Sequence, residues 1–394
     1  MSGGTLVAVG MVGMNVAMYA FTIIAARLLS PREFGALTAL LGVILVGNVA
    51  ALGLQAVVAR RISVDPKKRA AIVHATLRTT ALVAGGVGLL VAATTFLLTD
   101  ELKLDSRWPI VLCGATLVPL TVMGAQAGVA QGMRRWRSLT AIYVGNGLGR
   151  LVGGGIALLV DDSVTVAMIG VAAGAWVPVL IGSHLLTHGE PAKESRQPLL
   201  REVRLSTHAL LAYFVLSNMD ALIARNQFSE YESGLYASGL ILTKAALFFP
   251  QFVSVVLFPD MAKATGSGAK MRAAGLVAGF GCVAVTATAL LPWLALTLVG
   301  GDQYVEIQSR LWLFALSGAL LAVVHLLVFD ALARHAHGVT LMLWTAVATV
   351  AVLAYTLDVH ITGLVLIIAG TAATLAAATW FAPAPSREAD PAER

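Results

Sequence analysis

Apolar residues run along most of this chain in long stretches that are broken only by short polar segments. Twelve of these stretches approach or exceed the roughly 20 apolar residues that an α-helix needs to cross the hydrocarbon core of a bilayer. The pattern therefore predicts an all-α polytopic membrane protein with twelve transmembrane helices. We place them at 5–26, 36–59, 71–98, 109–132, 138–160, 164–187, 206–225, 234–259, 273–299, 311–330, 339–357 and 361–381.

A short motif occurs once in each half of the chain. Residues 29–35 and 228–234 both read apolar-Ser-x-x-Glu-x-Gly, and each copy follows an odd-numbered predicted helix. The Ser and Glu have the spacing of a helix capping box, and the Gly permits close approach of another backbone. Because six predicted helices separate the copies, both halves have the same orientation, which is a parallel repeat as found in many transporters.

The repeat suggests a division of the chain into two six-helix lobes. We expect an N-terminal lobe over residues 1–187, a cytoplasmic linker over 188–205 and a C-terminal lobe over 206–381. The tail over 382–394 is rich in Pro, Ala and charged residues, a composition typical of disorder.

Composition excludes several classes of protein. Of the 394 residues, 58% are hydrophobic and 12% are charged, whereas soluble domains have about 25% charged residues. Too little polar surface remains for a soluble enzyme, a disordered chain or a nucleic-acid-binding module. Cys113 and Cys282 lie in apolar stretches far apart, so neither a disulfide framework nor a metal cluster is expected.

Lys and Arg are unevenly distributed between the two sides of the predicted bundle. Eighteen fall in the tail and in connections on the side of the termini, and six fall in connections on the opposite side. Cytoplasmic connections carry the excess of Lys and Arg in membrane proteins. We therefore expect both termini in the cytoplasm and the two Ser-x-x-Glu-x-Gly motifs at the outer surface.

Four charged residues fall inside predicted helices, namely Arg78, Arg150, Lys244 and Asp220. Each costs about 2.5–3.5 kcal/mol near the bilayer centre, even on the lenient insertion scale. Asp220 and Lys244 lie at similar depths and could form an interior ion pair. Such a pair is either a structural link between two helices or a protonation switch, and the second reading makes Asp220 an ion-coupling candidate.

Neutral polar residues accompany these charges on single helix faces, at spacings of three, four or seven residues. Such faces on helices from both lobes predict one shared central cavity. The alternative is hydrogen bonding between helices, which accounts for Asn and Ser at modest energy. The predicted cavity residues within the helices are Asn15, Gln55, Asn146, Arg150, Lys244 and Gln251.

Motifs of the common enzyme classes do not occur in the sequence. It contains no His-Glu-x-x-His, no Cys-x-x-Cys and no phosphate-binding loop. The outer connections of about ten residues leave no room for a catalytic domain. We therefore expect neither an enzyme nor a cofactor.

Two segments resemble bacterial polysaccharide exporters of the multidrug/oligosaccharidyl-lipid/polysaccharide (MOP) flippase superfamily. The first is Ala-Ala-Arg-Leu-Leu-Ser-Pro-Arg-Glu-Phe-Gly at 25–35, continuing into Ala-Leu-Gly-Leu-Gln at 51–55 and Ala-Arg-Arg at 59–61. The second is Gly-Leu-Tyr-Ala at 234–237, ending in Leu-Phe-Pro at 257–259. The resemblance implies a MATE-like fold of two lobes in the bacterial inner membrane, with transport by alternating access.

The resemblance also implies a substrate class and its partners. Members of this branch carry an undecaprenyl-diphosphate-linked sugar from the inner to the outer leaflet and work beside polysaccharide polymerases or glycosyltransferases. A basic cavity that receives the diphosphate is a family expectation, and Arg150 and Lys244 fit it chemically. Arg27 and Arg225, at the outer ends of the first and seventh helices, are candidates to guard the exit.

Two departures from relatives narrow this prediction. Lipid II flippases usually carry two more helices than the twelve predicted here. Drug-extruding relatives often keep an acid in the first helix, where this chain has Asn15. The predicted function is a flippase for a lipid-linked oligosaccharide. The alternatives are a cation-coupled exporter of amphipathic small molecules that relies on Asp220, or a non-transporting scaffold of a polysaccharide assembly complex.

Overall fold

A computed structural model describes residues 3–185, 207–261, 267–333 and 338–381, without the side chains of 249–270, 329, 331–333 and 381. Every regular element in these ranges is a helix. The predicted linker at 188–205 and the predicted tail at 382–394 lie outside the described residues. We refer below to residues 3–185 as the N-terminal half and to residues 207–381 as the C-terminal half.

The N-terminal half contains nine α-helices and two short 3-10 helices. Three of its membrane-spanning stretches are broken into two helices, with breaks at Asn48, Thr94 and Ala175. The helices are α1 (Gly3–Leu28), α2 (Pro31–Gly47), α3 (Val49–Val64), α4 (Arg69–Ala93), α5 (Thr95–Glu101), α6 (Trp108–Gly132), α7 (Trp136–Val160), α8 (Val164–Gly174) and α9 (Trp176–Gly182).

The C-terminal half begins with a helix over Thr207–Leu216, which is bent by 40° relative to the helix that follows it. The remaining elements are α11 (Met219–Gln227), α12 (Glu230–Met261), α13 (Ser267–Leu290), α14 (Pro292–Val299), the 3-10 helix η3 (Asp302–Arg310), α15 (Leu311–Ala333), α16 (Gly338–Thr356) and α17 (Ile361–Phe381).

Each of the twelve predicted stretches coincides with one helix or one broken pair, so the prediction of an all-α polytopic membrane protein is confirmed. By length and apolar composition, ten helices of the described residues qualify as membrane spans, or eleven with the bent pair. The eighth stretch is α12, a 32-residue helix that carries Lys244 and is not among those ten or eleven.

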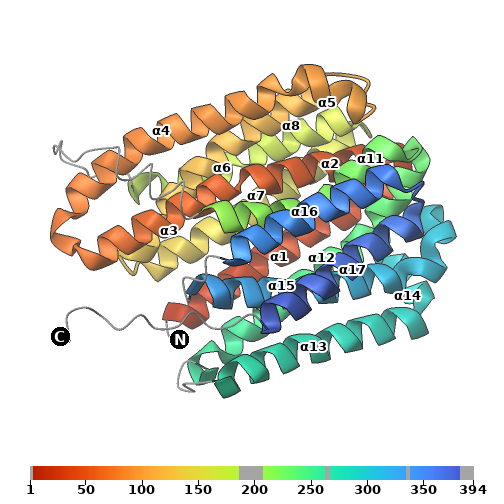
Figure 1. Cartoon of the computed structure of the whole chain (residues 1–394). Coiled ribbons are helices and arrows are strands. Elements are labelled where there is room, and N and C mark those ends of the chain that lie inside the picture. Colours follow the sequence, from red (N-terminus) through yellow and green to blue (C-terminus); the bar gives the residue numbers. More distant parts are fainter. Residues whose placement is uncertain (1–2, 186–206, 262–266, 334–337, 382–394) are drawn as a thin grey trace.

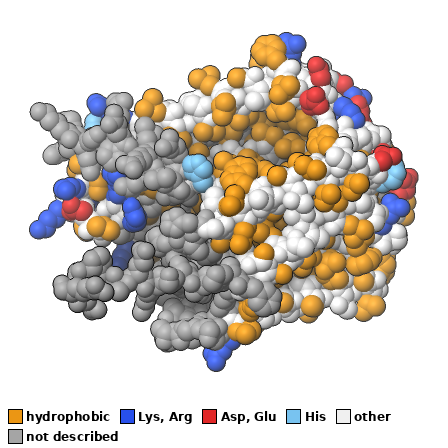
Figure 2. Space-filling model, viewed as in Figure 1, with side chains coloured by type: hydrophobic (Ala, Val, Ile, Leu, Met, Phe, Trp, Pro, Cys, Tyr) orange, Lys and Arg blue, Asp and Glu red, His pale blue; other side chains and the backbone are white. Residues whose placement is uncertain are grey.

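The helices run alongside one another in a bundle. In Figure 1, α4, α6 and α8 lie on one side and α13, α14 and α17 on the other, while α1, α2 and α12 lie between them. Contacts of α12 with α1 and α2 join the two halves. Charged side chains gather at the ends of the bundle, and an apolar belt lies between them (Figure 2). Large apolar side chains of this belt face outward, as Leu89 does with 73% exposure, because their solvent is lipid.

The capping predictions for the two sequence motifs can be compared directly. Ser30 caps α2 by accepting a hydrogen bond from the Glu33 amide. Ser229 and Glu232 form the full reciprocal box at the start of α12. Glu33 instead accepts a 2.6 Å hydrogen bond from the amide of Val164, at the start of α8. The first motif therefore caps two helices at once.

The two motifs lie against each other across the boundary between the halves. A Cβ on Gly35 would lie 2.7 Å from the Ser233 hydroxyl oxygen, and a Cβ on Gly234 would overlap the carbonyl oxygen of Pro31. The starts of α2 and α12 can approach this closely only because both positions are glycine. The internal repeat thus marks the contact between the two halves.

We expect Gly234→Ala to weaken this contact, because the new methyl group meets a backbone carbonyl that cannot rotate away. Overpacking of this kind costs about 1–3 kcal/mol. The measurement is thermal unfolding of the purified protein in detergent. Gly275→Ala is the matched control, since a Cβ at Gly275 meets no atom within 4 Å. Equal melting temperatures of the two variants would contradict the close approach.

Candidate functional site

A break in the first helix pair of the C-terminal half creates a polar site inside the bundle. Ser217 and Asn218 lie between Leu216 and α11, where the helical hydrogen-bonding pattern is interrupted. The Lys244 ammonium group of α12 donates hydrogen bonds to the Ser217 carbonyl and, at 2.9 Å, to Asn218 Oδ1. Asn218 Nδ2 in turn donates to the Phe214 carbonyl at 2.7 Å. Lys244 therefore satisfies the Ser217 carbonyl oxygen at the break and the amide oxygen of the Asn218 side chain.

Asp220 lies in the first turn of α11, directly after this break, and is 2% exposed. Its carboxylate accepts a 2.9 Å hydrogen bond from the Ala221 amide and a 3.3 Å bond from the Tyr236 hydroxyl. No salt bridge between Asp220 and Lys244 occurs among the described residues, although Lys244 acts on Asp220 through its charge. The two groups thus interact electrostatically, while each keeps its own hydrogen-bond partners.

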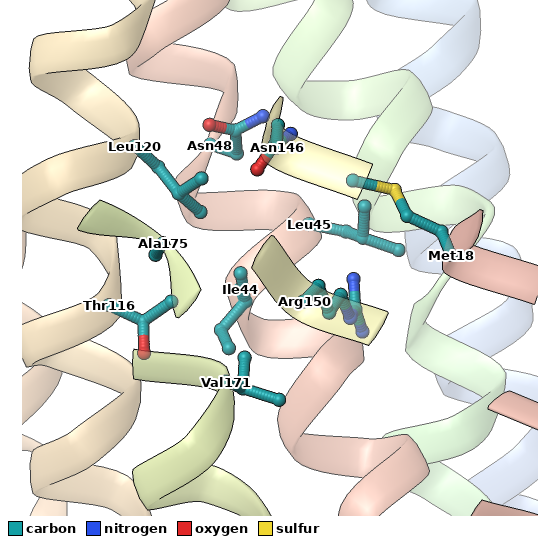
Figure 3. Close-up of a pocket in the computed structure, with 10 residues that line it drawn as sticks. All are labelled: Met18, Ile44, Leu45, Asn48, Thr116, Leu120, Asn146, Arg150, Val171 and Ala175. Carbon is teal, nitrogen blue, oxygen red and sulfur yellow. The ribbon is translucent and has the colours of Figure 1, made fainter. Parts of the chain in front are cut away.

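Arg150 occupies a different place, within the N-terminal half. It lines a cavity of about 50 Å³ between α1, α2, α6, α7 and α8, together with Asn48 and Asn146 (Figure 3). The remaining lining side chains carry no charge, namely Met18, Ile44, Leu45, Thr116, Leu120, Val171 and Ala175. Arg150 Nε and Asn48 Oδ1 are buried and have no hydrogen-bond partner.

In the described part of the chain, the Arg150 guanidinium group makes one electrostatic contact, with an aromatic ring. Its central carbon lies 5.4 Å from the centroid of the Phe21 ring, a cation–π contact. Such contacts contribute about 0.5–2 kcal/mol, whereas an unpaired charge in a low-dielectric interior costs several kcal/mol. Arg150 is therefore not explained by the stability of the fold.

Other predicted cavity residues make interhelical contacts or cannot be assigned. Gln55 Nε2 donates to the Tyr143 hydroxyl at 2.8 Å and to Gln131 Oε1 at 3.1 Å, which joins α3 to α6 and α7. Asn15 is a partly buried residue of α1. The side chain of Gln251 lies outside the described residues.

Arg225 lies at the predicted outer end of the bundle and is 1% exposed. Its guanidinium group donates to the carbonyl oxygens of Leu102 at 2.7 Å, Lys103 at 2.9 Å and Arg32 at 3.1 Å, all in the N-terminal half. A further 3.0 Å bond reaches the Ser233 hydroxyl. Arg225 is thus a link between the halves at the point where the two sequence motifs meet.

More side chains join the halves at the same end. Arg32 forms a salt bridge with Glu230 of α12 and a second one, at 2.6 Å, with Asp105 of its own half. Arg27 donates to the Thr297 carbonyl of α14 at 2.9 Å, and the Tyr304 hydroxyl donates to the Ala26 carbonyl at 3.0 Å. These contacts close the predicted outer end between the two halves.

An apolar crevice of about 460 Å³ lies between the halves. Its walls come from α2 and α3 on one side, from α4, and from the bent helix pair at the start of the C-terminal half. Thr207 is the polar residue of a lining that is otherwise apolar: Val43, Val46, Gly47, Val49, Ala50, Val87, Leu90, Val91, Leu211, Val215, Met219 and Leu222.

The structure distributes the predicted cavity residues over three places. Arg150 and Asn146 line the small cavity, Lys244 binds at the helix break, and Arg27 and Arg225 join the halves at one end. Helix α2 separates the first two places. Their roles in substrate binding stay predictions.

Sequence reasoning missed Asn218, Lys103 and Tyr304 as members of these sites. Asn218 had a local signal, because an adjacent Ser-Asn pair is unusual within an apolar stretch. Lys103, which also donates to the Phe228 carbonyl at 2.6 Å, and Tyr304 contact residues more than 120 positions away. No sequence spacing identifies such contacts.

We expect Arg225→Met to destabilise the protein by about 2–5 kcal/mol, because it leaves several carbonyl groups of the other half without a donor. The stability of Arg225→Lys should lie between that of this variant and that of the wild type. One ammonium group cannot replace all the hydrogen bonds of the planar guanidinium group. Thermal unfolding in detergent measures both. Arg310→Gln, at an exposed arginine of η3, is the control. Unchanged melting of Arg225→Met would mean that the contacts do not hold the halves together.

No protein-family model matches the chain, and no curated protein matches it either. Solved structures of MATE transporters, in contrast, superpose along nearly its whole length. An inward-facing multidrug resistance MATE family transporter of the MOP superfamily gives a TM-score of 0.71 at 10% identity, over 95% of this chain and 96% of that chain. A eukaryotic MATE transporter gives 0.64 at 14% identity, over 97% and 95%.

An outward-facing multidrug resistance MATE family transporter gives a TM-score of 0.59 at 13% identity, over 96% of each chain. The named neighbours are transporters and not enzymes. The chain therefore has the fold of the MATE transporters of the MOP superfamily, as the sequence resemblance predicted.

Proposed function

We propose that this chain is a flippase of the bacterial inner membrane that translocates a lipid-linked oligosaccharide, a polysaccharide precursor, by alternating access between its two halves. The observation that carries the proposal is the apolar crevice beside the Lys244 site. Leu211, Val215 and Met219 line the crevice, while Ser217 and Asn218 of the same bent helix pair bind Lys244.

This juxtaposition suits the chemistry of a prenyl-diphosphate-linked sugar. The crevice offers a prenyl chain an apolar surface between the halves, so that the chain need not leave the hydrocarbon phase. A lysine ammonium group next to it supplies the charge-assisted hydrogen bonds that phosphate oxygens accept. A ligand of this kind needs both features within one site.

Alternating access also needs contacts between the halves that break reversibly. Several links at the predicted outer end are suited to this, because they are single hydrogen bonds to backbone carbonyls, from Arg27 and Tyr304, and the partly exposed ion pair between Arg32 and Glu230. Exposed ion pairs contribute about 0–1 kcal/mol each. Binding of a substrate between the halves can offset their loss, provided that it favours the open state.

A second candidate function is supported by Asp220 and by the fold. The solved neighbours are described as multidrug resistance transporters, and a buried carboxylate is the group that a cation-coupled exporter needs. Asp220, bonded to Tyr236, would bind the coupling cation in that case. This function requires no lipid-sized apolar volume beside the polar site.

We expect Lys244→Ala and Leu211→Trp each to abolish polysaccharide export while the protein stays in the membrane at wild-type level. The first removes the cation of the headgroup site, and the second fills the crevice. Export is measured as cell-surface polysaccharide in a strain whose only copy of this gene carries the variant. Leu89→Trp, on the outward face of α4, is the control for a large aromatic substitution and should export normally.

Normal export by both Lys244→Ala and Leu211→Trp would refute this assignment of the site. The exporter alternative is tested in the same strains by measuring tolerance of cationic drugs on overexpression. This alternative predicts that overexpression raises drug tolerance and that Asp220→Asn abolishes the increase. It also predicts that none of the variants changes polysaccharide export. A non-transporting scaffold predicts normal export from variants of all four charged residues inside the helices.

A further inference from the structure

The Arg150 cavity is not used by the proposed flippase mechanism. It lies among helices of the N-terminal half, whereas the crevice and Lys244 involve the boundary with the C-terminal half. A cavity needs about 10–15 Å³ to hold one water molecule. The volume of about 50 Å³ is therefore enough for a few water molecules or one small ion. A diphosphate carrying a sugar does not fit there.

We propose that this cavity is a binding site for a small inorganic anion of the size of chloride, with Arg150 as its counter-charge. The strongest support is the state of the Arg150 side chain. Its Nε is buried without a hydrogen-bond partner, and no salt bridge of Arg150 occurs in the described ranges. A guanidinium group has five N–H donors and no acceptor, so only an acceptor or an anion can satisfy it.

The lining of the cavity selects for negative charge. None of its ten residues is an Asp or Glu, and Arg150 is the charged member of the set. Apolar walls from α1, α2, α6 and α8 keep the local dielectric low, which strengthens the attraction between the guanidinium group and an anion. A cation in the same place would be repelled, so this site is opposite in sign to the Asp220 site.

Two amide side chains, Asn48 and Asn146, add neutral donors to the cavity lining and lie above Arg150 in Figure 3. Within the described residues, the Asn48 amide makes no hydrogen bond, and its Oδ1 is buried without a partner. A half-turn of this amide presents its NH₂ group to the cavity instead. Asn146 Nδ2 lies 3.6 Å from the Met14 sulfur, a weak acceptor that an anion can replace. The Thr116 hydroxyl already donates to the Leu112 carbonyl at 2.7 Å.

Helix α2 connects this cavity to the Lys244 site. It contributes Ile44 and Leu45 to the cavity, and Asn48 at its end. On the same helix, a Cβ at Gly42 would lie 3.5 Å from the Asn218 carbonyl oxygen, so α2 packs on the segment that binds Lys244. Anion occupancy therefore acts on a helix that both halves share. This inference concerns an ion site and does not depend on which substrate the protein carries.

The test measures the thermal stability of the full chain, purified in detergent, at constant ionic strength and constant sodium. Sodium gluconate is replaced stepwise by sodium chloride or sodium bromide, and in a separate arm by sodium pyrophosphate. A ligand that binds only the folded state raises the melting temperature in a saturable manner. For the wild type we expect a rise of about 3 °C with chloride and with bromide, and none with pyrophosphate.

Matched variants assign the effect to the cavity. Arg150→Gln should lose the chloride response, and Arg150→Lys should keep part of it. Arg78→Gln, which removes an exposed arginine of α4, should respond as the wild type does. Asn48→Leu and Asn146→Leu retain the buried charge and should raise the chloride concentration at half-effect several-fold. These two variants keep the test decisive if Arg150→Gln does not fold.

Three results would overturn the inference. One is a wild-type melting temperature that is the same in chloride and in gluconate. Another is a saturable chloride response that survives in Arg150→Gln, Asn48→Leu and Asn146→Leu. The third is a response to pyrophosphate that needs Arg150 while chloride has no effect, which would make Arg150 part of the headgroup site. A chloride response in a protein whose Lys244→Ala and Leu211→Trp variants both export normally would retain the anion site and reject the proposed headgroup site.

Discussion

A polar group inside a bilayer must find its partner within the protein, because lipid offers none, and this constraint governs the rest of the structure. It explains why the described chain is helical and why a break in a helix inside the bundle needs a substitute donor or acceptor. Lys244 serves the break at Ser217 and Asn218 in this way. Arg150 stands out against the same rule, because its guanidinium group has no hydrogen-bonding partner in the described structure. A residue that violates the constraint needs a functional reason, and a bound anion is one that its surroundings support.

The two halves are joined most strongly at one end, through residues that the internal repeat brings together. Gly35 and Gly234 allow the starts of α2 and α12 to touch, and Arg225 spans the same boundary with three hydrogen bonds to backbone carbonyls of the N-terminal half. Away from this end, the halves are separated by the apolar crevice. One closed end and an apolar crevice between the halves suit the proposed translocation of an amphipathic lipid.

Much of the fold was predictable because the membrane imposes a simple rule on length and polarity. Each predicted apolar stretch coincides with a helix or a broken pair, and both predicted Ser caps are present at α2 and α12. The partner of Glu33 was not predictable, since it reaches α8 more than a hundred residues away. The site was predictable in part. Helix-face spacing identified Arg150, Asn146 and Lys244 as polar residues that face the interior of the bundle, but it assigned them to one shared cavity.

The sequence alone determined which segments enter the membrane and which charged residues are out of place there, because hydrophobicity and the cost of a buried charge depend on local composition. Only the tertiary structure decided what those charges face. Periodicity places a side chain on one face of its own helix and carries no information about the helix opposite. Arg150 consequently meets Phe21 and an uncharged cavity, Lys244 meets a broken helix, and Arg225 meets the backbone of the other half. Long-range packing, which brings together residues up to 278 positions apart, sets these environments.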